Sequence, residues 1–309
     1  MPPDEGSGAG DDRVPITIGV DLGQSVTDAV ALGPGGELLH HHALAARGRE
    51  PGTALEAALA ALADATSTAR VVGLSGGRSA SLALDERRER RPRIVTVAEP
   101  EAIGRGGLHL SGLPAALVVS CGTGTAMVVA RAGTPERREA FDHATGTPVG
   151  GGTLRALGRL LLGSDDAEAI AELAAQGDAS RVDTTLADVL GTGLGSLPPE
   201  ATAVSLGRLA DAAEGADPRH DVDRADLAAA LVTMVAQTIA IIAVNAVRAQ
   251  DLPAVVMVGR VATLAPVRSM LQAVFRVYGV SDLLHLPAGG GAATAIGAAL
   301  AVRAPHATD

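Results

Sequence analysis

The sequence predicts an α/β protein of two lobes, each built on a mixed sheet flanked by helices. Three observations support this: the chain is long, its apolar residues are almost all aliphatic, and an apolar hairpin followed by strand–helix alternation occurs twice. At 309 residues the chain exceeds what one hydrophobic core usually holds. We expect an N-terminal lobe at residues 15–114 and a C-terminal lobe at 115–303, with a disordered tail at 1–14 and a second tail at 304–309.

The first lobe is predicted to open on a meander of three strands. Its first strand is the apolar, β-branched run from Pro15 to Asp21, and turn residues separate it from the strands that follow. An alanine- and leucine-rich segment then predicts a helix that leads into a further strand. In order after the first strand, we expect strands at 26–32 and 37–43, a helix at 53–64 and a strand at 70–74.

The second lobe repeats this opening. An apolar strand from Ala115 to Ser120 runs into a glycine- and threonine-rich turn, and a second strand returns from it. Helices and short strands then alternate. In order after the first strand, we expect a strand at 126–131, helices at 150–162, 165–176 and 223–249, a strand at 254–258, a helix at 264–278, a strand at 283–286 and a last helix ending near 303.

Composition excludes several classes of function. Nearly half of the residues are apolar (47%), but only three are aromatic, so Ala, Val, Leu and Ile must fill the core. The apolar run from Leu227 to Val247 has the length of a membrane-spanning helix. Polar residues interrupt it and charged residues bound it, so the sequence favours a buried central helix and no membrane partner.

Charge and cysteine content point the same way. The net charge of −10 argues against a nucleic-acid partner, which needs a clustered basic face. The arginine-dense run at 86–91 is interleaved with acids and predicts a solvated helix end. The single cysteine, Cys121, excludes an internal disulfide and fits a reducing compartment. Since the N-terminus lacks the apolar segment of a signal peptide, we expect a cytoplasmic protein. All 25 basic residues are arginine.

Two tight turns between apolar strands carry the residue types of a phosphate site. In the first, Asp21 ends a strand and supplies a carboxylate for a metal ion, and the small residues after it offer backbone N–H groups. Such a turn alone is as often structural as functional. The second alternates glycine and threonine, so backbone can approach closely. The two turns comprise Gly23, Gln24 and Ser25, and Gly122, Thr123, Gly124 and Thr125. Together they predict a cleft that holds a triphosphate from both lobes.

Two glycine-rich segments precede helices. The segment 145–153, with Gly146 and the run Gly150, Gly151 and Gly152, enters an apolar helix, whose first-turn N–H groups make an anion site. A flexible loop is the alternative. The run at 289–291 allows flat packing against an adenine ring, or is merely a turn between elements. Without lysine no Walker A motif exists, and no dinucleotide-binding glycine fingerprint follows the first strand. Any phosphate clamp must therefore be the two hairpin turns.

The acids Glu99 and Glu101 begin a predicted helix directly after a strand. Such acids commonly stabilise the helix dipole, and from the residues alone this is the favoured interpretation. In a cleft, the same carboxylate would accept the proton of an attacking hydroxyl. The histidines at 40–42 alternate on a predicted strand, which disfavours a shared metal site. A packing role for Cys121 is simpler than a nucleophilic one.

The ordered set of motifs resembles the type II pantothenate kinases, members of the acetate/sugar kinase, Hsp70 and actin superfamily. The resemblance runs from about Ile16 to Val302, and its most specific parts are 122–125, 146–153, 175–178, 256–259 and 291–298. It implies an actin-like ATPase fold of duplicated ribonuclease H-like units, with nucleotide-binding helices in the C-terminal lobe. It further implies ATP and Mg²⁺ as cofactors, pantothenate as substrate and a homodimer, with the helix from Leu227 at the interface.

The resemblance also implies roles for single residues. Glu99 falls on the catalytic base and Asp21 on the metal-associated aspartate. The nucleotide would further meet Gly259, and the substrate would meet Glu101, Arg105, His143 and Gly146.

Three departures from the family pattern affect these roles. Gln24 replaces a second glycine in the first turn, Asp28 replaces a lysine, and His143 replaces an arginine on the substrate side. At close range, an anion in place of a cation near the γ-phosphate costs on the order of several kcal/mol of transition-state stabilisation. Because the chain has no lysine, only arginine or a metal ion could compensate.

The leading hypothesis is an ATP-dependent kinase that phosphorylates the primary hydroxyl of pantothenate, the first step of coenzyme A biosynthesis. One alternative keeps the nucleotide-binding fold without this activity, because Asp28 disables transfer. Another keeps phosphoryl transfer with a different small hydroxyl substrate, for which His143 is the motive. An activator ATPase with a bridging iron–sulfur cluster is disfavoured, because one cysteine per chain cannot supply four thiolates to a dimer.

Overall fold

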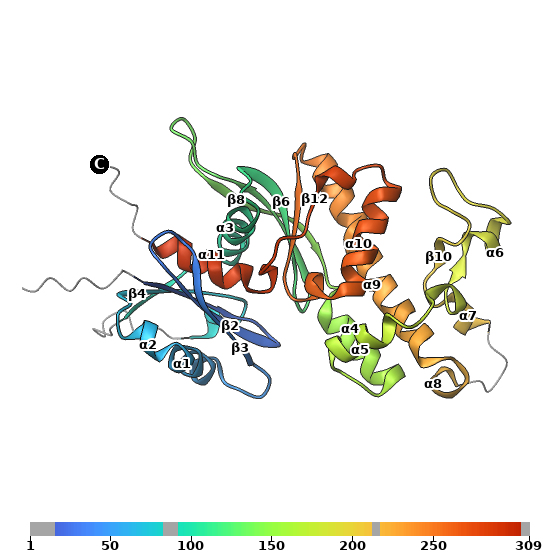
Figure 1. Cartoon of the computed structure of the whole chain (residues 1–309), viewed down its shortest axis with the longest axis horizontal. Coiled ribbons are helices and arrows are strands. Elements are labelled where there is room, and N and C mark those ends of the chain that lie inside the picture. The colour runs from blue at the N-terminus through green and yellow to red at the C-terminus, as the bar shows by residue number, and fades with distance from the viewer. Residues whose placement is uncertain (1–15, 83–91, 212–216, 304–309) are drawn as a thin grey trace, which may run out of the picture.

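The computed structural model describes residues 16–82, 92–211 and 217–303, and it contains two five-stranded sheets lying side by side (Figure 1). The predicted tails at 1–14 and 304–309 and the arginine-dense run at 86–91 lie outside the described residues.

The first sheet has the order β3-β2-β1-β4-β5. An antiparallel meander of three strands continues into parallel strands, as the sequence indicates for the meander and the strand at 70–74. The pairing of the first two strands sets Asp21 opposite Asp28, and Asp21 also lies beside Ser75 of the next strand. Its strands are β1 (Thr17–Leu22), β2 (Val26–Leu32), β3 (Leu38–Ala45), β4 (Val71–Ser75) and β5 (Arg93–Thr96).

The second sheet has the order β12-β11-β6-β7-β8 and repeats this plan. An antiparallel meander is again extended by parallel strands, which confirms the predicted duplication of a mixed-sheet unit. Its strands are β6 (Ala115–Cys121), β7 (Thr125–Arg131), β8 (Ala140–Thr147), β11 (Val255–Val258) and β12 (Leu284–His285).

The long helix α9 (Arg224–Ala249) forms the core of the second half. Asp223 caps it by accepting hydrogen bonds from the first-turn N–H groups. The helix is long and apolar enough to cross a membrane, but 72% of its apolar window is buried against the second sheet and its neighbouring helices. The prediction of a buried central helix is confirmed. This burial also leaves little of the apolar face for the dimer interface expected there.

The segment 175–178 packs against the start of this helix. Gly177 lies so close that a methyl group would overlap the carbonyl of Ala225, and the backbone N–H of Asp178 donates to the Asp226 carboxylate at 2.7 Å. This conspicuous motif therefore positions α9.

Two helices exchange sheets. Helix α3 (Glu99–Ser111) follows the first sheet in the chain but packs on β6, β7 and β8, whereas α11 (Ala293–Val302) follows the second sheet but packs on β1 and β4. Glycines allow this close approach, because a methyl group at Gly19 or Gly106 would overlap a carbonyl oxygen of α11. The two helices also pack against each other, which joins the halves of the molecule.

The remaining elements lie around these layers. The expected helix at 53–64 is interrupted at Leu62, and the helix entered from the glycine run ends in a π-helical turn. The other helices are α1 (Pro51–Ala61), α2 (Ala63–Thr66), α4 (Gly151–Leu157), α5 (Ala167–Ala174), α6 (Leu186–Leu190), α7 (Gly207–Ala210), α8 (Pro218–Asp221) and α10 (Ala265–Val277), with strands β9 (Thr184–Thr185) and β10 (Thr202–Val204). Short 3₁₀ turns occur at Ser79–Ser81, Ala179–Arg181, Val261–Thr263, Ser281–Leu283 and Gly290–Ala292, and the π-helical turn is Gly158–Leu162.

Candidate functional site

A cavity of about 650 Å³ lies between the two sheets, where both hairpin turns meet it. This volume is within the usual range for small-molecule sites. Of the residues selected from the sequence, those that line it are Asp21, Gly23, Gln24, Ser25, Gly122, Thr123, Gly151 and Gly259. The cavity therefore gathers segments from both halves of the chain.

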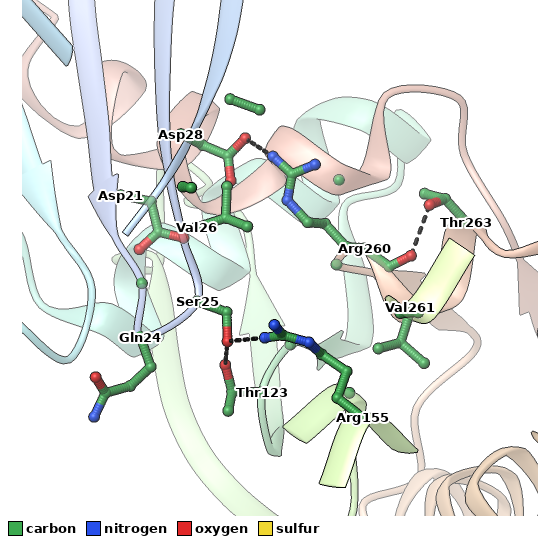
Figure 2. A pocket seen from close by; sticks show the side chains of 18 of the residues that line it. Asp21, Gln24, Ser25, Val26, Asp28, Thr123, Arg155, Arg260, Val261 and Thr263 are labelled. Atoms are coloured by element: carbon green, nitrogen blue, oxygen red, sulfur yellow. Dashed lines mark hydrogen bonds and ion pairs between the residues drawn. The ribbon is translucent and has the colours of Figure 1, made fainter. Parts of the chain in front are cut away.

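The two turns face each other, as the sequence predicts. Ser25 Oγ and Thr123 Oγ1 lie 3.2 Å apart although 98 positions separate them in the chain (Figure 2). Gln24, which stands where a second glycine was expected, is exposed, and its side chain points away from Ser25 and Thr123. The Gln24 side chain therefore does not lie between the two hydroxyls.

Both turns present unpaired backbone donors. Within the described residues, the N–H groups of Gly23, Gln24, Thr123 and Gly124 make no hydrogen bond to the protein. Successive free N–H groups in a tight turn form a concave anion site. Because each turn offers such donors from its own side of the cavity, the pair can hold a chain of phosphates between them.

The glycine run at 150–152 packs against the second turn. Its N–H groups are engaged: Gly151 donates to the carbonyl of Gly122 at 2.9 Å, and Gly152 to that of Thr123 at 2.8 Å. A Cβ at Gly150 would lie 2.8 Å from the Thr123 carbonyl oxygen. The expectation of unpaired first-turn donors is wrong here, because the turn itself uses them. The run supports the second turn from behind.

Thr125 and Gly146 also support this turn. The Thr125 hydroxyl donates to the carbonyl of Val149 at 2.9 Å, and the side chain is buried. Gly146 lies on β8, where a Cβ would come within 2.5 Å of the Thr125 carbonyl oxygen. Neither residue lines the cavity.

Asp21 lines the cavity near the end of β1, just before the first turn. The pKa of its carboxyl is raised to about 7, mainly by burial and then by the charges of Asp28 and Glu99, while Arg260 acts in the opposite direction. No hydrogen bond from the described residues reaches this carboxylate. A cation would relieve its desolvation.

The residues fit Mg²⁺ better than an all-protein metal cage. No cluster of three or more His, Cys, Asp or Glu side chains that could hold a metal ion occurs among the described residues. Mg²⁺ typically uses one or two carboxylates together with substrate phosphates and water. Asp21, unpaired and beside the turns, is suited to such a site.

Glu99 lies near Asp21, at the first position of α3. It is exposed, and its charge contributes to the raised pKa of Asp21. A Cβ at Gly77 would be 3.9 Å from Glu99 Oε2, and a Cβ at Gly76, just before it, would overlap Asp21 Oδ1. Glu99 is therefore adjacent to the cavity without being among its lining residues.

The other proposed substrate residues lie along α3 and β8, away from the cavity lining. Arg105 pairs with Glu101, with Nε 2.9 Å from Oε1, and also with Glu139. Its guanidinium lies 5.0 Å from the centre of the Phe141 ring. His143 is exposed on β8, on the face that carries Phe141. The structure brings Glu101 and Arg105 together, but Arg105 is already neutralised.

Several contacts of the lining residues were not found from the sequence. Asp28, which stands where the resemblance places a lysine, is buried and pairs with Arg260 (Figure 2) and with His41, whose Nε2 is 2.7 Å from Oδ1. The only sequence signal was the absence of lysine, which left arginine or a metal ion to compensate the anion. Nothing identified Arg260, although it directly follows Gly259.

A second group bridges the cavity nearer its rim. Arg155 of α4 donates to Ser25 Oγ at 3.2 Å and to the carbonyl of Asp165 at 2.8 Å. Arg47, which follows β3, reaches the Asp165 carboxylate at 2.7 Å. The Arg155–Ser25 and Arg47–Asp165 contacts join the two halves of the molecule, and neither was predicted from the sequence.

Comparison with known structures shows the fold. A 2-hydroxyisocaproyl-CoA dehydratase activator from Clostridium difficile, with bound ADPNP, aligns over 93% of both chains with a TM-score of 0.59 and 15% identity. A ROK hexokinase from Thermus thermophilus aligns over 92% of this chain and 97% of that one, with a TM-score of 0.52 and 18% identity. The predicted two-lobed actin-like fold is confirmed.

Comparison of sequences shows the family. A type II pantothenate kinase from Oceanobacillus iheyensis is 29% identical over 192 residues, which are 60% of this chain and 65% of that protein. The match thus spans slightly less than two thirds of that relative. The model of the Fumble family matches residues 111–278, more than half of the chain, including the second turn and its glycine support. The chain belongs to the Fumble family, that of the type II pantothenate kinases.

Proposed function

We propose that this protein is an ATP-dependent kinase that phosphorylates the primary hydroxyl of pantothenate or a closely related compound. One observation carries the proposal: two turns with free N–H groups face each other at a cavity that Asp21 also lines. Family membership supplies the acceptor class, since the curated relative is a type II pantothenate kinase.

The chain's residues divide the work of the reaction. The free N–H groups of Gly23, Gln24, Thr123 and Gly124 hold the phosphates. The glycine run at 289–291, of which Gly291 lines the cavity, gives the adenine a flat surface. Asp21 would hold Mg²⁺, which supplies charge neutralisation between the phosphates. Thr125 and the run at 150–152 keep the second turn in shape.

Glu99 is the proposed general base. The acceptor hydroxyl oxygen attacks the γ-phosphorus, the bond from that phosphorus to the β–γ bridging oxygen breaks, and ADP leaves with that oxygen. The hydroxyl proton passes to Glu99, which is exposed beside the cavity and near Asp21. Removal of this base by Glu99→Gln should reduce turnover by about 100-fold or more with little change in ATP affinity.

The direct test combines purified protein, Mg-ATP and pantothenate, with products identified by mass spectrometry. We expect phosphopantothenate and ADP in equal amounts. Absence of phosphopantothenate while ATP binding is intact would overturn the pantothenate assignment.

A different small hydroxyl acceptor is the second candidate, and the state of Arg105 favours it. Its guanidinium is paired with two carboxylates and stacked on an aromatic ring, so it offers no free cation to a substrate carboxylate. A screen of metabolite hydroxyls for ATP consumption distinguishes this candidate from the first.

We further propose a cytoplasmic homodimer. Support comes from family membership and from the single, buried cysteine. Light scattering after size exclusion should give twice the chain mass of 30.8 kDa, and a monomeric mass at assay concentration would reject the dimer.

A further inference from the structure

The most unusual feature of the cavity is an ion pair that crosses it. Asp28 lies on β2 of the first sheet with 6% of its side chain exposed, and Arg260 directly follows the β11–Gly259 turn of the second. The two are 232 positions apart in the chain, and Figure 2 shows the guanidinium pointing at the carboxylate. The pair forms only when the two halves are as close as they are in this structure.

The backbone fixes where Arg260 begins. Gly259 has a positive φ of 87°, and a Cβ there would lie 2.5 Å from the carbonyl oxygen of Cys121. The Gly259 N–H donates to the carbonyl of Gly290 at 2.8 Å. The chain therefore passes directly over the start of the turn at 122–125. Arg260 therefore follows directly on a residue packed against the start of that turn, and both line the cavity.

Most of the Arg260 guanidinium remains available. One terminal nitrogen binds Asp28, whereas Nε is buried without a hydrogen-bond partner in the described structure. A guanidinium carries five N–H donors in a planar fork, so a single carboxylate contact leaves donors for an anion.

The other two arginines that line the cavity within the described residues are less suited. Nε and Nη1 of Arg155 already donate to the Asp165 carbonyl and to Ser25, and its Nη2 lies 3.7 Å from the Asp165 carboxylate. Arg47 lies at the rim with 56% of its side chain exposed and pairs with Asp165.

We propose that Arg260 binds the nucleotide phosphates and that Asp28 is the positioning residue that holds it across the cavity. This deepens the proposed function and rests on its nucleotide site. Arg260 then supplies the cation that a chain without lysine must obtain from arginine. Asp28 supports phosphate binding by holding Arg260 in place, so it does not disable the nucleotide site.

The first test measures ATP and adenosine affinity by titration calorimetry with Mg²⁺ and without an acceptor. Arg260→Gln should weaken ATP binding by about 10- to 100-fold, which is the contribution that a hydrogen bond to a charged group makes to affinity. Adenosine affinity should change by less than about twofold, which also shows that the variant is folded. Arg260→Lys should retain part of the ATP affinity. Arg276→Gln, an equal charge change on an exposed site of α10, is the matched control.

The second test separates positioning from simple repulsion. If Asp28 orients Arg260, Asp28→Asn weakens ATP binding by about three- to tenfold, the cost of ordering a freed side chain. In the Arg260→Gln background the same change strengthens ATP binding, because only repulsion of phosphate is then removed. Strengthening in both backgrounds, or an unchanged ATP-to-adenosine ratio in Arg260→Gln, would overturn the proposal.

The readout needs no acceptor, so it does not depend on the substrate assignment. Wild-type protein that binds ATP but yields no phosphopantothenate refutes pantothenate alone and leaves the Arg260 test valid. Wild-type protein that does not bind ATP refutes the nucleotide site, and the role of Arg260 with it.

Discussion

The raised pKa of Asp21 makes a quantitative prediction about stability. Its carboxyl shifts from 3.8 to about 7 because burial, then the charges of Asp28 and Glu99, disfavour the ionised form. Between about pH 4 and pH 7 the folded chain therefore binds more protons than the unfolded chain, and the free energy of unfolding falls as pH rises through this window. Because the pKa of Asp21 is shifted by about three units, its ionisation lowers the free energy of unfolding by about 4 kcal/mol above pH 8.

The perturbation is Asp21→Asn, which removes the charge but keeps the shape. Relative to wild type, we expect the variant to gain up to about 4 kcal/mol at pH 8 and to gain almost nothing near pH 4. The assay is urea unfolding of both proteins at pH 4, 5, 6, 7 and 8 without nucleotide. Asp282→Asn, at an exposed site outside the cavity, is the matched control and should stay within about 0.5 kcal/mol of wild type.

Ligand addition adds a second readout for the same residue. If Asp21 holds Mg²⁺, Mg-ATP should stabilise wild type more than Asp21→Asn at pH 8, because the ion offsets the buried charge. A difference between variant and wild type that is the same at pH 5 and pH 8 would refute the reasoning, as would a variant less stable than wild type at pH 8.

The remaining predictions concern packing, charge and reactivity. Gly106→Ala should lower the free energy of unfolding by about 3 kcal/mol or more, measured by chemical denaturation, since its methyl group would overlap a carbonyl of α11. Gly52→Ala on α1 should be neutral or stabilising, because its methyl group would meet only Leu82, at an ordinary contact distance of 3.8 Å. Asp28→Lys should destabilise the protein by about 3 kcal/mol, because it sets two cations against each other in a buried site, and it should not raise kinase turnover; higher turnover would support an inactive parent. Burial raises the pKa of the Cys121 thiol to about 12, so a thiol reagent at pH 8 should label it only after unfolding, and rapid labelling of the native protein would contradict the structure.

The fold follows from the sequence wherever the signal is local. The strand Val26–Leu32 and the long helix after Asp223 were predicted almost to the residue, because turn glycines and a capping aspartate mark their ends. Strand β8 was missed, since its residues are mostly half-buried or exposed and a bulge breaks its alternation. The segment from 179 to 211 was not predicted either, because its strands and helices are only two to five residues long.

The site shows the same limit. Both turns could be located from glycine, threonine and aspartate at strand ends, because those residue types carry local conformational information. The pairing of Asp28 with Arg260 could not be predicted, since Arg260 is 232 positions away and only the packing of the two sheets brings it near. Likewise, the chemistry of the glycine run at 150–152 depends on which carbonyls its N–H groups meet, and its composition does not reveal this.

The central claim is that the turns at 23–25 and 122–125 hold one nucleotide from both sides of the cavity. Hydrogen–deuterium exchange with and without a non-hydrolysable ATP analogue and Mg²⁺ tests it directly, because the free N–H groups of these turns would become hydrogen-bonded to phosphate. We predict slower exchange in both turns at the same ligand concentration. Protection of only one turn, or of neither while the analogue is bound, would contradict the account.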